Sequence, residues 1–260
     1  MDDEAFTDHV RDRLAGLPRV LAVTLGGSRA QGTHRPDSDW DFAIYYRTAF
    51  DPQGLRDIGW PGEVFGIGEW GGVVFNGGAW LRIDGRRVDV HYRDLDSIDH
   101  ELAESAQGRF RIEPLMFHLA GIPSYIVLAE LAMNRVLSGE LPRPDYPAAL
   151  REPASQAWWD RAERTFDYAI KNYAPLGRVS ECAGLIGQAA AQAAHAVLAA
   201  RGQWVTNDKR LLNLAGLRQL DEFVAQGALD PGLLGSAVEQ ALALCRQVLA
   251  ETGPAPAASA

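Results

Sequence analysis

The sequence predicts an α+β protein, in which an N-terminal mixed β-sheet with helices is followed by a C-terminal all-helical bundle. Two observations support this class. Strand-like runs rich in Val, Leu and Ile lie in the first part of the chain, whereas the apolar period becomes helical from about Asp99 onward. A segment with three prolines, ELPRPDYP at residues 140–147, interrupts the helical pattern and predicts a linker or a sharp corner.

The N-terminal elements alternate between helix and strand. Apolar residues from Phe6 to Leu17 recur at helical spacing, and Pro18 is expected to end that helix. Two runs dominated by Val, Leu, Ile and aromatic residues then predict buried strands, at residues 19–25 and 40–47. The chain therefore begins as a helix followed by two strands.

A glycine-dense stretch and a hairpin complete the predicted sheet. Eight glycines between residues 59 and 78 exclude a helix there and predict a mobile loop or a strongly bent pair of strands. The run AWLRIDGRRVDVHYRD follows, at residues 79–94. Its Asp84-Gly85 pair is a strong signal for a hairpin turn between two alternating segments.

Helices are expected in the remainder of the chain. The run IPSYIVLAELAMNRVLSG carries an apolar stripe that ends at Gly139. The tail GPAPAASA is low in complexity, so we expect it to be disordered. Four further helices are expected near residues 154–173, 179–201, 208–216 and 232–251. The predicted domains are residues 1–110, residues 111–252 and a tail over 253–260.

Composition restricts the classes of function. The net charge is −9 and no long Lys/Arg run is present, which argues against a nucleic acid as the main partner. No apolar run reaches the ~18 residues that span a bilayer, and the acidic N-terminus MDDEAFTDHVRDRL has no signal-peptide core. We therefore expect a cytoplasmic protein with no membrane partner. Cys182 and Cys245 lie in apolar helical patterns, which favours buried free thiols.

An acidic pair marks the start of the second predicted strand. Asp39 and Asp41 flank Trp40, and side chains two residues apart on a strand share a face, with Cα atoms ~7 Å apart. Two carboxylates held in this way suit a hard cation such as Mg²⁺, which prefers oxygen ligands. The opposite face presents Trp40, Phe42 and Ile44, which suit packing against a helix.

The hairpin supplies a third carboxylate. Val88 and Val90 point to one side of the strand, while Asp89 and His91 point to the other. If this strand lies beside the first, the three aspartates form one cluster. Because like charges a few ångströms apart repel strongly, such a cluster requires bound cations or a protonated member.

A glycine turn completes the pattern. Gly26-Gly27-Ser28 follows a strand and is expected to open a short helix. Glycine lets the backbone approach a ligand closely, and exposed N–H groups at a helix start favour phosphate. The Ser28 hydroxyl can donate to the same phosphate. A phosphate cradle ten residues before a two-carboxylate metal site indicates a nucleoside triphosphate with Mg²⁺.

These residues resemble a known signature. Gly27-Ser28, a spacer of ten residues, Asp39-Trp40-Asp41 and a later Asp89 are similar to the pattern of the polymerase-β nucleotidyltransferase superfamily. The chain resembles in particular the small-molecule branch with a fused helical domain, such as the aminoglycoside and lincosamide nucleotidyltransferases. The specific motif covers residues 26–41 and Asp89, and the domain order extends the likeness loosely over the chain.

The resemblance implies a fold, a reaction and a set of roles. It implies a catalytic domain over 1–110, and a helical domain over 111–252 that closes over substrate and nucleotide. One or two Mg²⁺ ions and ATP or another NTP are implied, with Asp39 and Asp41 binding both ions and Asp89 the catalytic one. Asp89 or another carboxylate takes the acceptor proton, and His91 is the less favoured alternative. The implied nucleotide-binding residues are Gly27, Ser28, Arg29 and Lys209, the last within WVTNDKRLL, where Thr206 or Asn207 can cap a helix.

Three functions remain open from the sequence. The first is transfer of a nucleoside monophosphate, AMP in the leading case, to a hydroxyl of a small molecule with release of pyrophosphate. An aminoglycoside antibiotic would suit the acidic chain, because an anionic groove attracts a polycation. The second is modification of a partner protein, as in antitoxin-like nucleotidyltransferases. The third is a nucleotide-binding regulatory module without turnover.

Overall fold

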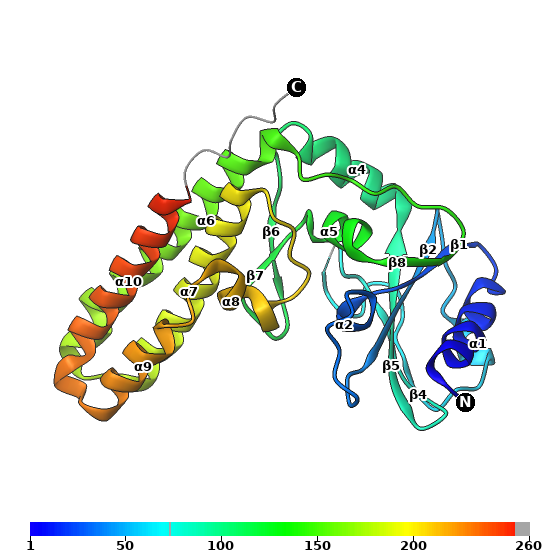
Figure 1. Cartoon of the computed structure of the whole chain (residues 1–260), viewed down its shortest axis with the longest axis horizontal. Coiled ribbons are helices and arrows are strands. Elements are labelled where there is room, and N and C mark those ends of the chain that lie inside the picture. Colours follow the sequence, from blue (N-terminus) through cyan, green and yellow to red (C-terminus); the bar gives the residue numbers. More distant parts are fainter. Residues whose placement is uncertain (73, 253–260) are drawn as a thin grey trace. The chain divides into compact units, whose positions relative to one another are not determined.

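The computed structural model describes residues 1–72 and 74–252 and confirms the predicted α+β class (Figure 1). The chain divides into two compact units, each of which combines two separate segments. Unit 1 contains Met1–Ala103 and Pro123–Asp145, and unit 2 contains Glu104–Ile122 and the chain from Tyr146 onward. The functional division at residues 110 and 111 stays a prediction, and the tail at 253–260 lies outside the described residues.

A six-stranded sheet forms the centre of unit 1. Its strand order is β3-β4-β5-β2-β1-β8, with β2 and β5 parallel and the other neighbours antiparallel. The strands are β1 (Val20–Leu25), β2 (Trp40–Tyr46), β3 (Gly62–Val64), β4 (Gly78–Ile83), β5 (Arg86–Asp94) and β8 (Arg135–Ser138). The accompanying helices are α1 (Asp3–Ala15), α2 (Gly27–Ala30), α3 (Gln53–Asp57), α4 (Leu95–Ser105) and α5 (Ile126–Met133).

Helices α1 and α3 cover the apolar face of this sheet. Asp2 caps α1, accepting a hydrogen bond of 2.8 Å from the Ala5 N–H, and the helix ends at Ala15, before Pro18 as predicted. The cluster under these helices includes Phe6, Val10 and Leu14 from α1, Leu55 from α3, and Trp40, Phe42, Ile44, Val88 and Val90 from the strands. The alternation in the sequence therefore identified the core face of both β2 and β5 correctly.

Helix α5 packs on the opposite face of the sheet through a buried ion pair (Figure 1). The guanidinium of Arg93 on β5 is 1% exposed and donates two hydrogen bonds, of 2.5 and 2.8 Å, to the Glu130 carboxylate on α5. Arg93 also lies 4.1 Å above the Phe75 ring. Two parallel hydrogen bonds between a guanidinium and a carboxylate favour one orientation of α5 on the sheet.

The predicted hairpin turn is confirmed. Asp84 and Gly85 both have positive φ, of 49° and 75°, which is the conformation of a two-residue turn of type I′. This turn pairs Ile83 with Arg86 and continues the register to Gly78 opposite His91. Local turn chemistry thus determines which residues of β4 face which residues of β5.

The uniformly helical pattern expected after Asp99 is wrong in three places. Strands β6 (Ile112–Leu115) and β7 (His118–Pro123) form a separate two-stranded sheet, and β8 adds an edge strand to the main sheet beside β1. The apolar stripe expected to reach Gly139 is helical only over α5. Asn134 is extended, and the next residues pair with β1. At these residues the backbone N–H and C=O groups form hydrogen bonds with a strand that is distant in the sequence. The spacing of apolar residues along the chain does not reveal such pairing.

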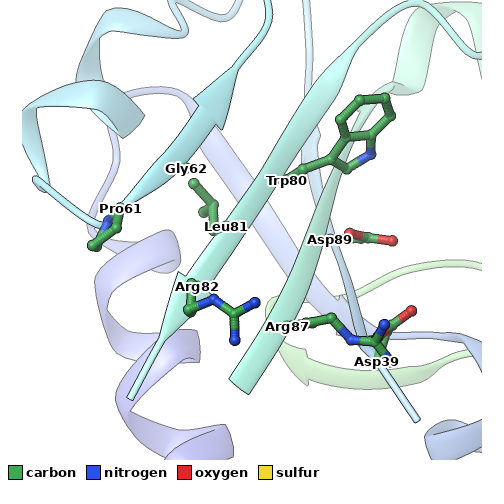
Figure 2. A pocket seen from close by; sticks show the side chains of 8 residues that line it. All are labelled: Asp39, Pro61, Gly62, Trp80, Leu81, Arg82, Arg87 and Asp89. Carbon is green, nitrogen blue, oxygen red and sulfur yellow. The ribbon is translucent and has the colours of Figure 1, made fainter. Parts of the chain in front are cut away.

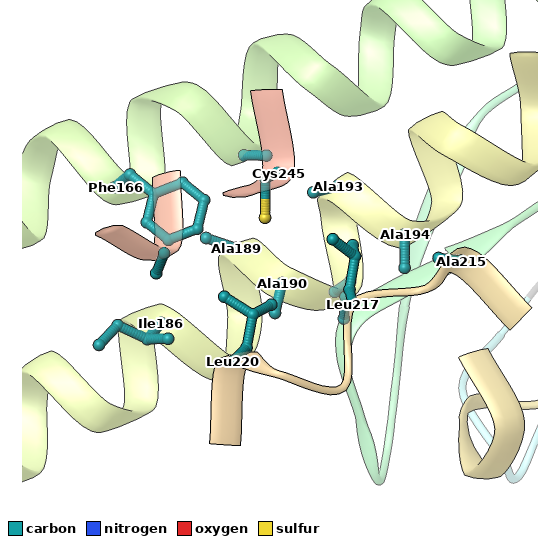
Figure 3. Close-up of a cluster of buried hydrophobic side chains, with 14 of the residues drawn as sticks. Phe166, Ile186, Ala189, Ala190, Ala193, Ala194, Ala215, Leu217, Leu220 and Cys245 are labelled. Atoms are coloured by element: carbon teal, nitrogen blue, oxygen red, sulfur yellow. The ribbon is translucent and has the colours of Figure 1, made fainter. Parts of the chain in front are cut away.

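Unit 2 is built around an alanine-rich helix. Besides β6 and most of β7, it contains α6 (Ala148–Tyr168), α7 (Val179–Arg201), α8 (Leu211–Ala215), α9 (Leu220–Leu229) and α10 (Leu234–Glu251), with short turns η1 (Ala169–Tyr173), η2 (Ala174–Leu176), η3 (Asp208–Arg210) and η4 (Pro231–Leu233). Buried alanines of α7, among them Ala189, Ala190 and Ala193, contact larger side chains of the neighbouring helices (Figure 3). The expected helices are therefore confirmed, and α9 is an additional one.

Helix α7 is long and apolar enough, by length and composition, to cross a membrane. However, 72% of its most apolar window is buried within the structure, as in the core helix of a water-soluble protein. Cys182 and Cys245 are free and buried, as expected. Burial raises the pKa of the Cys245 thiol to about 12, so this group is protonated at neutral pH.

Candidate functional site

The parallel pair β2 and β5 brings two of the predicted carboxylates together. Asp41 lies directly opposite Asp89 in the register, and neighbouring strands are ~4.8 Å apart. Both side chains are half-buried on the face opposite the apolar cluster. Asp39 comes two residues before Asp41 and is also half-buried. The arrangement inferred from alternation, with acids from two strands on one face, is present in the fold.

The Gly26–Ser28 turn packs directly against Asp41. The Gly26 N–H donates a hydrogen bond of 2.7 Å to the Asp41 carbonyl, and the turn leads into α2. Gly27 has a φ of +58°, and a Cβ atom at this position would lie only 1.8 Å from Asp41 Oδ2. Only glycine therefore allows the turn and the carboxylate to occupy adjacent space.

Gly27→Ala is expected to lower transfer activity about 100-fold, because the new methyl group must displace the Asp41 carboxylate. Gly32→Ala is the matched control. Gly32 also has a positive φ, of +66°, but nothing lies within 4 Å of a Cβ atom built there. Both variants should lose about 1–2 kcal/mol of stability from left-handed strain. Steady-state kinetics and urea unfolding of the two variants check this. Equal activity losses in both would show that backbone strain, and not the carboxylate, is responsible.

Asp39 is held by an arginine from the next strand. Arg87 Nε on β5 lies 2.6 Å from Asp39 Oδ1, and Arg87 Nη2 donates 2.9 Å to the Asp37 carbonyl. Within the described residues, the buried Oδ1 atom has no hydrogen bond of regular geometry, so the contact with Arg87 is mainly electrostatic. Arg87 thus compensates part of the negative charge of the acidic face, by which we mean the side of β2 and β5 that carries Asp39, Asp41 and Asp89.

Arg29 and Lys209 are the two predicted nucleotide-binding cations, and they belong to different units. The Arg29 guanidinium lies 3.9 Å above the Trp40 ring, on the core side of β2, and donates to the Ser38 and Asp39 carbonyls at 3.0 and 3.3 Å. In the structure it braces the loop that carries Asp39. Lys209 belongs to unit 2, where its N–H donates 3.1 Å to the Asn207 side chain, the expected cap. The roles of both in nucleotide binding stay predictions.

A pocket of about 380 Å³ adjoins Asp39 and Asp89 (Figure 2). Its lining comes from the acidic face of β5, from β4 and from the start of β3. Trp80 and Arg82 project from β4 to the same side as Asp89, and Arg87 extends toward Asp39 (Figure 2). The lining includes Asp39, Gly62, Trp80, Arg82, Arg87 and Asp89. Both acids and arginines therefore face the same space.

Aromatic residues of the glycine-dense loop support one wall of this pocket. Trp70 stacks on Trp80 with ring centroids 5.9 Å apart, and Phe65 meets Trp80 edge-on at 4.8 Å. A Cβ atom on Gly78 would lie 2.4 Å from the Trp70 ring, so glycine at this position admits the indole. The stretch expected to be a loop or bent strands is therefore partly ordered by its own aromatic residues.

His91 follows Asp89 on the same face but is a poor proton acceptor. Its ring lies 5.7 Å from Trp70 and 6.3 Å from Phe75. Burial, together with the nearby Arg93 charge, lowers the pKa of His91 to about 3, so the ring is neutral and weakly basic at neutral pH. These surroundings favour a packing role over proton transfer.

The sequence analysis missed Trp80, Arg82 and Arg87, although a signal for the first two was present. In AWLRI the apolar residues Ala79, Leu81 and Ile83 alternate with Trp80 and Arg82. A tryptophan on the polar face of a strand is unusual, and Trp80 is 43% exposed. The Asp84-Gly85 turn also sets the register that places Trp80 opposite Asp89, whereas the contact of Arg87 with Asp39 joins β5 to the segment before β2 and had no local signal.

The acidic face fits a divalent cation by its chemistry. Asp39, Asp41 and Asp89 offer only carboxylate oxygens, the ligands that Mg²⁺ prefers, and the buried Asp39 Oδ1 lies 2.6 Å from the Arg87 guanidinium. As they stand, no three His, Cys, Asp or Glu side chains of the described chain are grouped closely enough to hold a metal ion.

Comparison with known proteins identifies the N-terminal region. A family model described as "Nucleotidyltransferase domain" matches residues 8–106, which include β1, β2, β5 and the acidic face. A crystal structure of a nucleotidyltransferase-like protein from Exiguobacterium sibiricum 255-15 is similar over 96% of this chain and 75% of that chain, with 12% identity and a TM-score of 0.43. None of the curated proteins matches the sequence.

Proposed function

Because residues 8–106 form a nucleotidyltransferase domain of the polymerase-β-like superfamily, we propose that this enzyme transfers AMP from ATP to a hydroxyl group of a small molecule. One observation supports a small molecule as the acceptor. The acidic pair Asp41 and Asp89 adjoins both the Gly27 turn and a pocket of about 380 Å³, a size that suits a small molecule.

The Gly27-Ser28 turn is proposed to hold the triphosphate tail. Gly27 brings the turn next to the Asp41 carboxylate, and the half-buried Ser28 follows it at the start of α2. Asp39, Asp41 and Asp89 are proposed to hold one or two Mg²⁺ ions. When bound, Mg²⁺ would neutralise the phosphate oxygens and stabilise the charge that develops on the leaving group.

The transfer exchanges one phosphorus–oxygen bond for another. The acceptor oxygen forms a bond to the α-phosphorus as the bond from that phosphorus to the bridging oxygen breaks, and pyrophosphate leaves with the electron pair. The hydroxyl proton passes to a carboxylate oxygen of Asp89, which lies beside the pocket. Arg87 remains close enough to Asp39 to limit repulsion within the acidic face.

Mass spectrometry of acceptors, combined with pyrophosphate release, tests this function. The protein is incubated with each of the four NTPs, with Mg²⁺ or with EDTA, and with a panel of hydroxyl compounds that includes aminoglycosides. We expect a Mg²⁺-dependent mass increase equal to one nucleoside monophosphate on a small acceptor. Labelling of lysate proteins alone would favour the protein-modifying alternative. Nucleotide binding without pyrophosphate release under any condition would instead indicate a regulatory module.

A further inference from the structure

The pocket beside Asp89 has a defined place in the proposed reaction. We propose that it is the acceptor subsite and that it takes a planar ring bearing an anionic group, with Trp80 stacking on the ring and Arg82 binding the anion. This inference rests on the proposed function for the direction of transfer. The chemistry of the subsite rests on the side chains alone.

The order of strands places the pocket on the acceptor side. Across the sheet, the Gly27 turn follows β1, Asp41 lies on β2, Asp89 on β5 and Trp80 on β4. In an in-line displacement the attacking oxygen and the leaving pyrophosphate lie on opposite sides of the phosphorus. If the turn holds the pyrophosphate end, the acceptor must approach from the side of β4.

Trp80 is prepared to stack against a ligand. It is directly opposite Asp89 in the antiparallel register, so both side chains rise from the same face. One contact with Trp70, at 5.9 Å, and one with Phe65, at 4.8 Å, hold the indole in place while 43% of the residue remains exposed. A rigid, exposed aromatic ring at a pocket wall favours a flat partner.

Arg82 determines the charge of that partner. Under the proposed function Asp39 and Asp89 serve the metal ions and Arg87 stays paired with Asp39, which leaves Arg82 as the charged group of the lining that faces an acceptor. Arg82 is exposed, and within the described part of the chain its guanidinium donates one hydrogen bond, of 3.2 Å, to the Gly85 carbonyl, so several N–H donors remain for a ligand. Guanidinium groups match carboxylate and phosphate oxygens, and this chemistry opposes the polycationic acceptor considered from net charge.

Binding of a matched pair of probes tests the proposal without turnover. Calorimetry compares 4-hydroxybenzoate with its neutral analogue 4-hydroxybenzamide on the full-length protein. Wild type should bind the anion about tenfold more tightly, as expected for one charge-assisted hydrogen bond. Arg82→Gln should abolish this preference, whereas Arg13→Gln, at an exposed arginine on α1, should preserve it.

Substitutions of Trp80 distinguish aromatic stacking on the probe from simple apolar contact with a side chain. Trp80→Leu should weaken both probes about tenfold, and Trp80→Phe, which retains a ring, should weaken them less. Near-ultraviolet circular dichroism confirms that both variants fold. Equal affinity of wild type for the two probes, or a preference that survives Arg82→Gln, would overturn the proposal.

Affinity for Mg²⁺-ATP distinguishes this proposal from the proposed function. We expect less than about a twofold change in the ATP dissociation constant in Arg82→Gln and Trp80→Leu, because neither residue faces the nucleotide in this scheme. A large loss of ATP affinity with unchanged probe binding would assign the pocket to the nucleotide and refute the acceptor subsite. Failure of nucleotidyl transfer in the acceptor panel would refute the proposed function and leave the probe result standing.

Discussion

Asp41→Asn is expected to reduce nucleotidyl transfer by at least ~10²–10³-fold, the usual cost of removing one group that stabilises charge in a transition state. Asparagine has the shape of aspartate, so its contact with Gly27 is retained and only the negative charge is lost. Stability should not fall, because the substitution removes one of two like charges that face each other on β2 and β5.

Asp37→Asn is the matched control for this substitution. Asp37 belongs to the same acidic run, PDSDWD, but its side chain is 73% exposed and pairs only loosely, at 3.4 Å, with Arg35. Its replacement should leave kcat and KM nearly unchanged. Initial rates of pyrophosphate release and calorimetric Mg²⁺ binding should be measured for both variants. Normal turnover in Asp41→Asn would remove this carboxylate from the mechanism.

Glu130→Ala is expected to destabilise unit 1 by about 3–5 kcal/mol, because it leaves the buried guanidinium of Arg93 without its charge partner. The cation–π contact with Phe75 and the bond to the Tyr92 carbonyl remain, but neither supplies a negative charge. Chemical denaturation followed by circular dichroism measures the loss. A decrease below about 1 kcal/mol would show that these remaining contacts are sufficient.

Two further variants identify the cause of this instability. Replacing both partners, in Arg93→Met with Glu130→Met, should recover much of the lost stability, because no unpaired charge is then buried. Asp221→Ala breaks an exposed ion pair, in which the side chains of Arg218 and Asp221 are 55% and 66% exposed. This variant should lose no more than about 1 kcal/mol of stability. A double variant as unstable as Glu130→Ala would indicate that the loss of side-chain packing, and not an unpaired charge, causes the loss of stability.

The acidic face could be predicted because its signals are local. Alternation over Trp40–Ile44 and Val88–His91 separates a core side from a polar side without reference to the rest of the fold. The positive φ at Gly27 and at the Asp84-Gly85 turn follows from side chains that tolerate it. The Gly26–Ser28 turn, the hairpin and the two acidic strands were therefore accessible from the amino-acid order.

Several contacts could not be predicted because they join distant segments. The role of Arg29 at the nucleotide stays a prediction, and only the structure shows that its guanidinium lies over Trp40 and donates to the Ser38 and Asp39 carbonyls. The segment at residues 135–138 has a pattern compatible with a helix, and only an open edge on β1 made it a strand. Competition between local and long-range hydrogen bonds decides such cases.

The amino-acid sequence alone determined the class of fold. It also determined which face of each acidic strand is apolar and which face carries the aspartates. Those properties depend on backbone geometry within a few residues. The tertiary structure decided that Asp41 stands opposite Asp89 and that Arg87 contacts Asp39. The register between β2 and β5 and the choice of ion pairs are set by packing between segments far apart in the chain, and local periodicity carries no record of them.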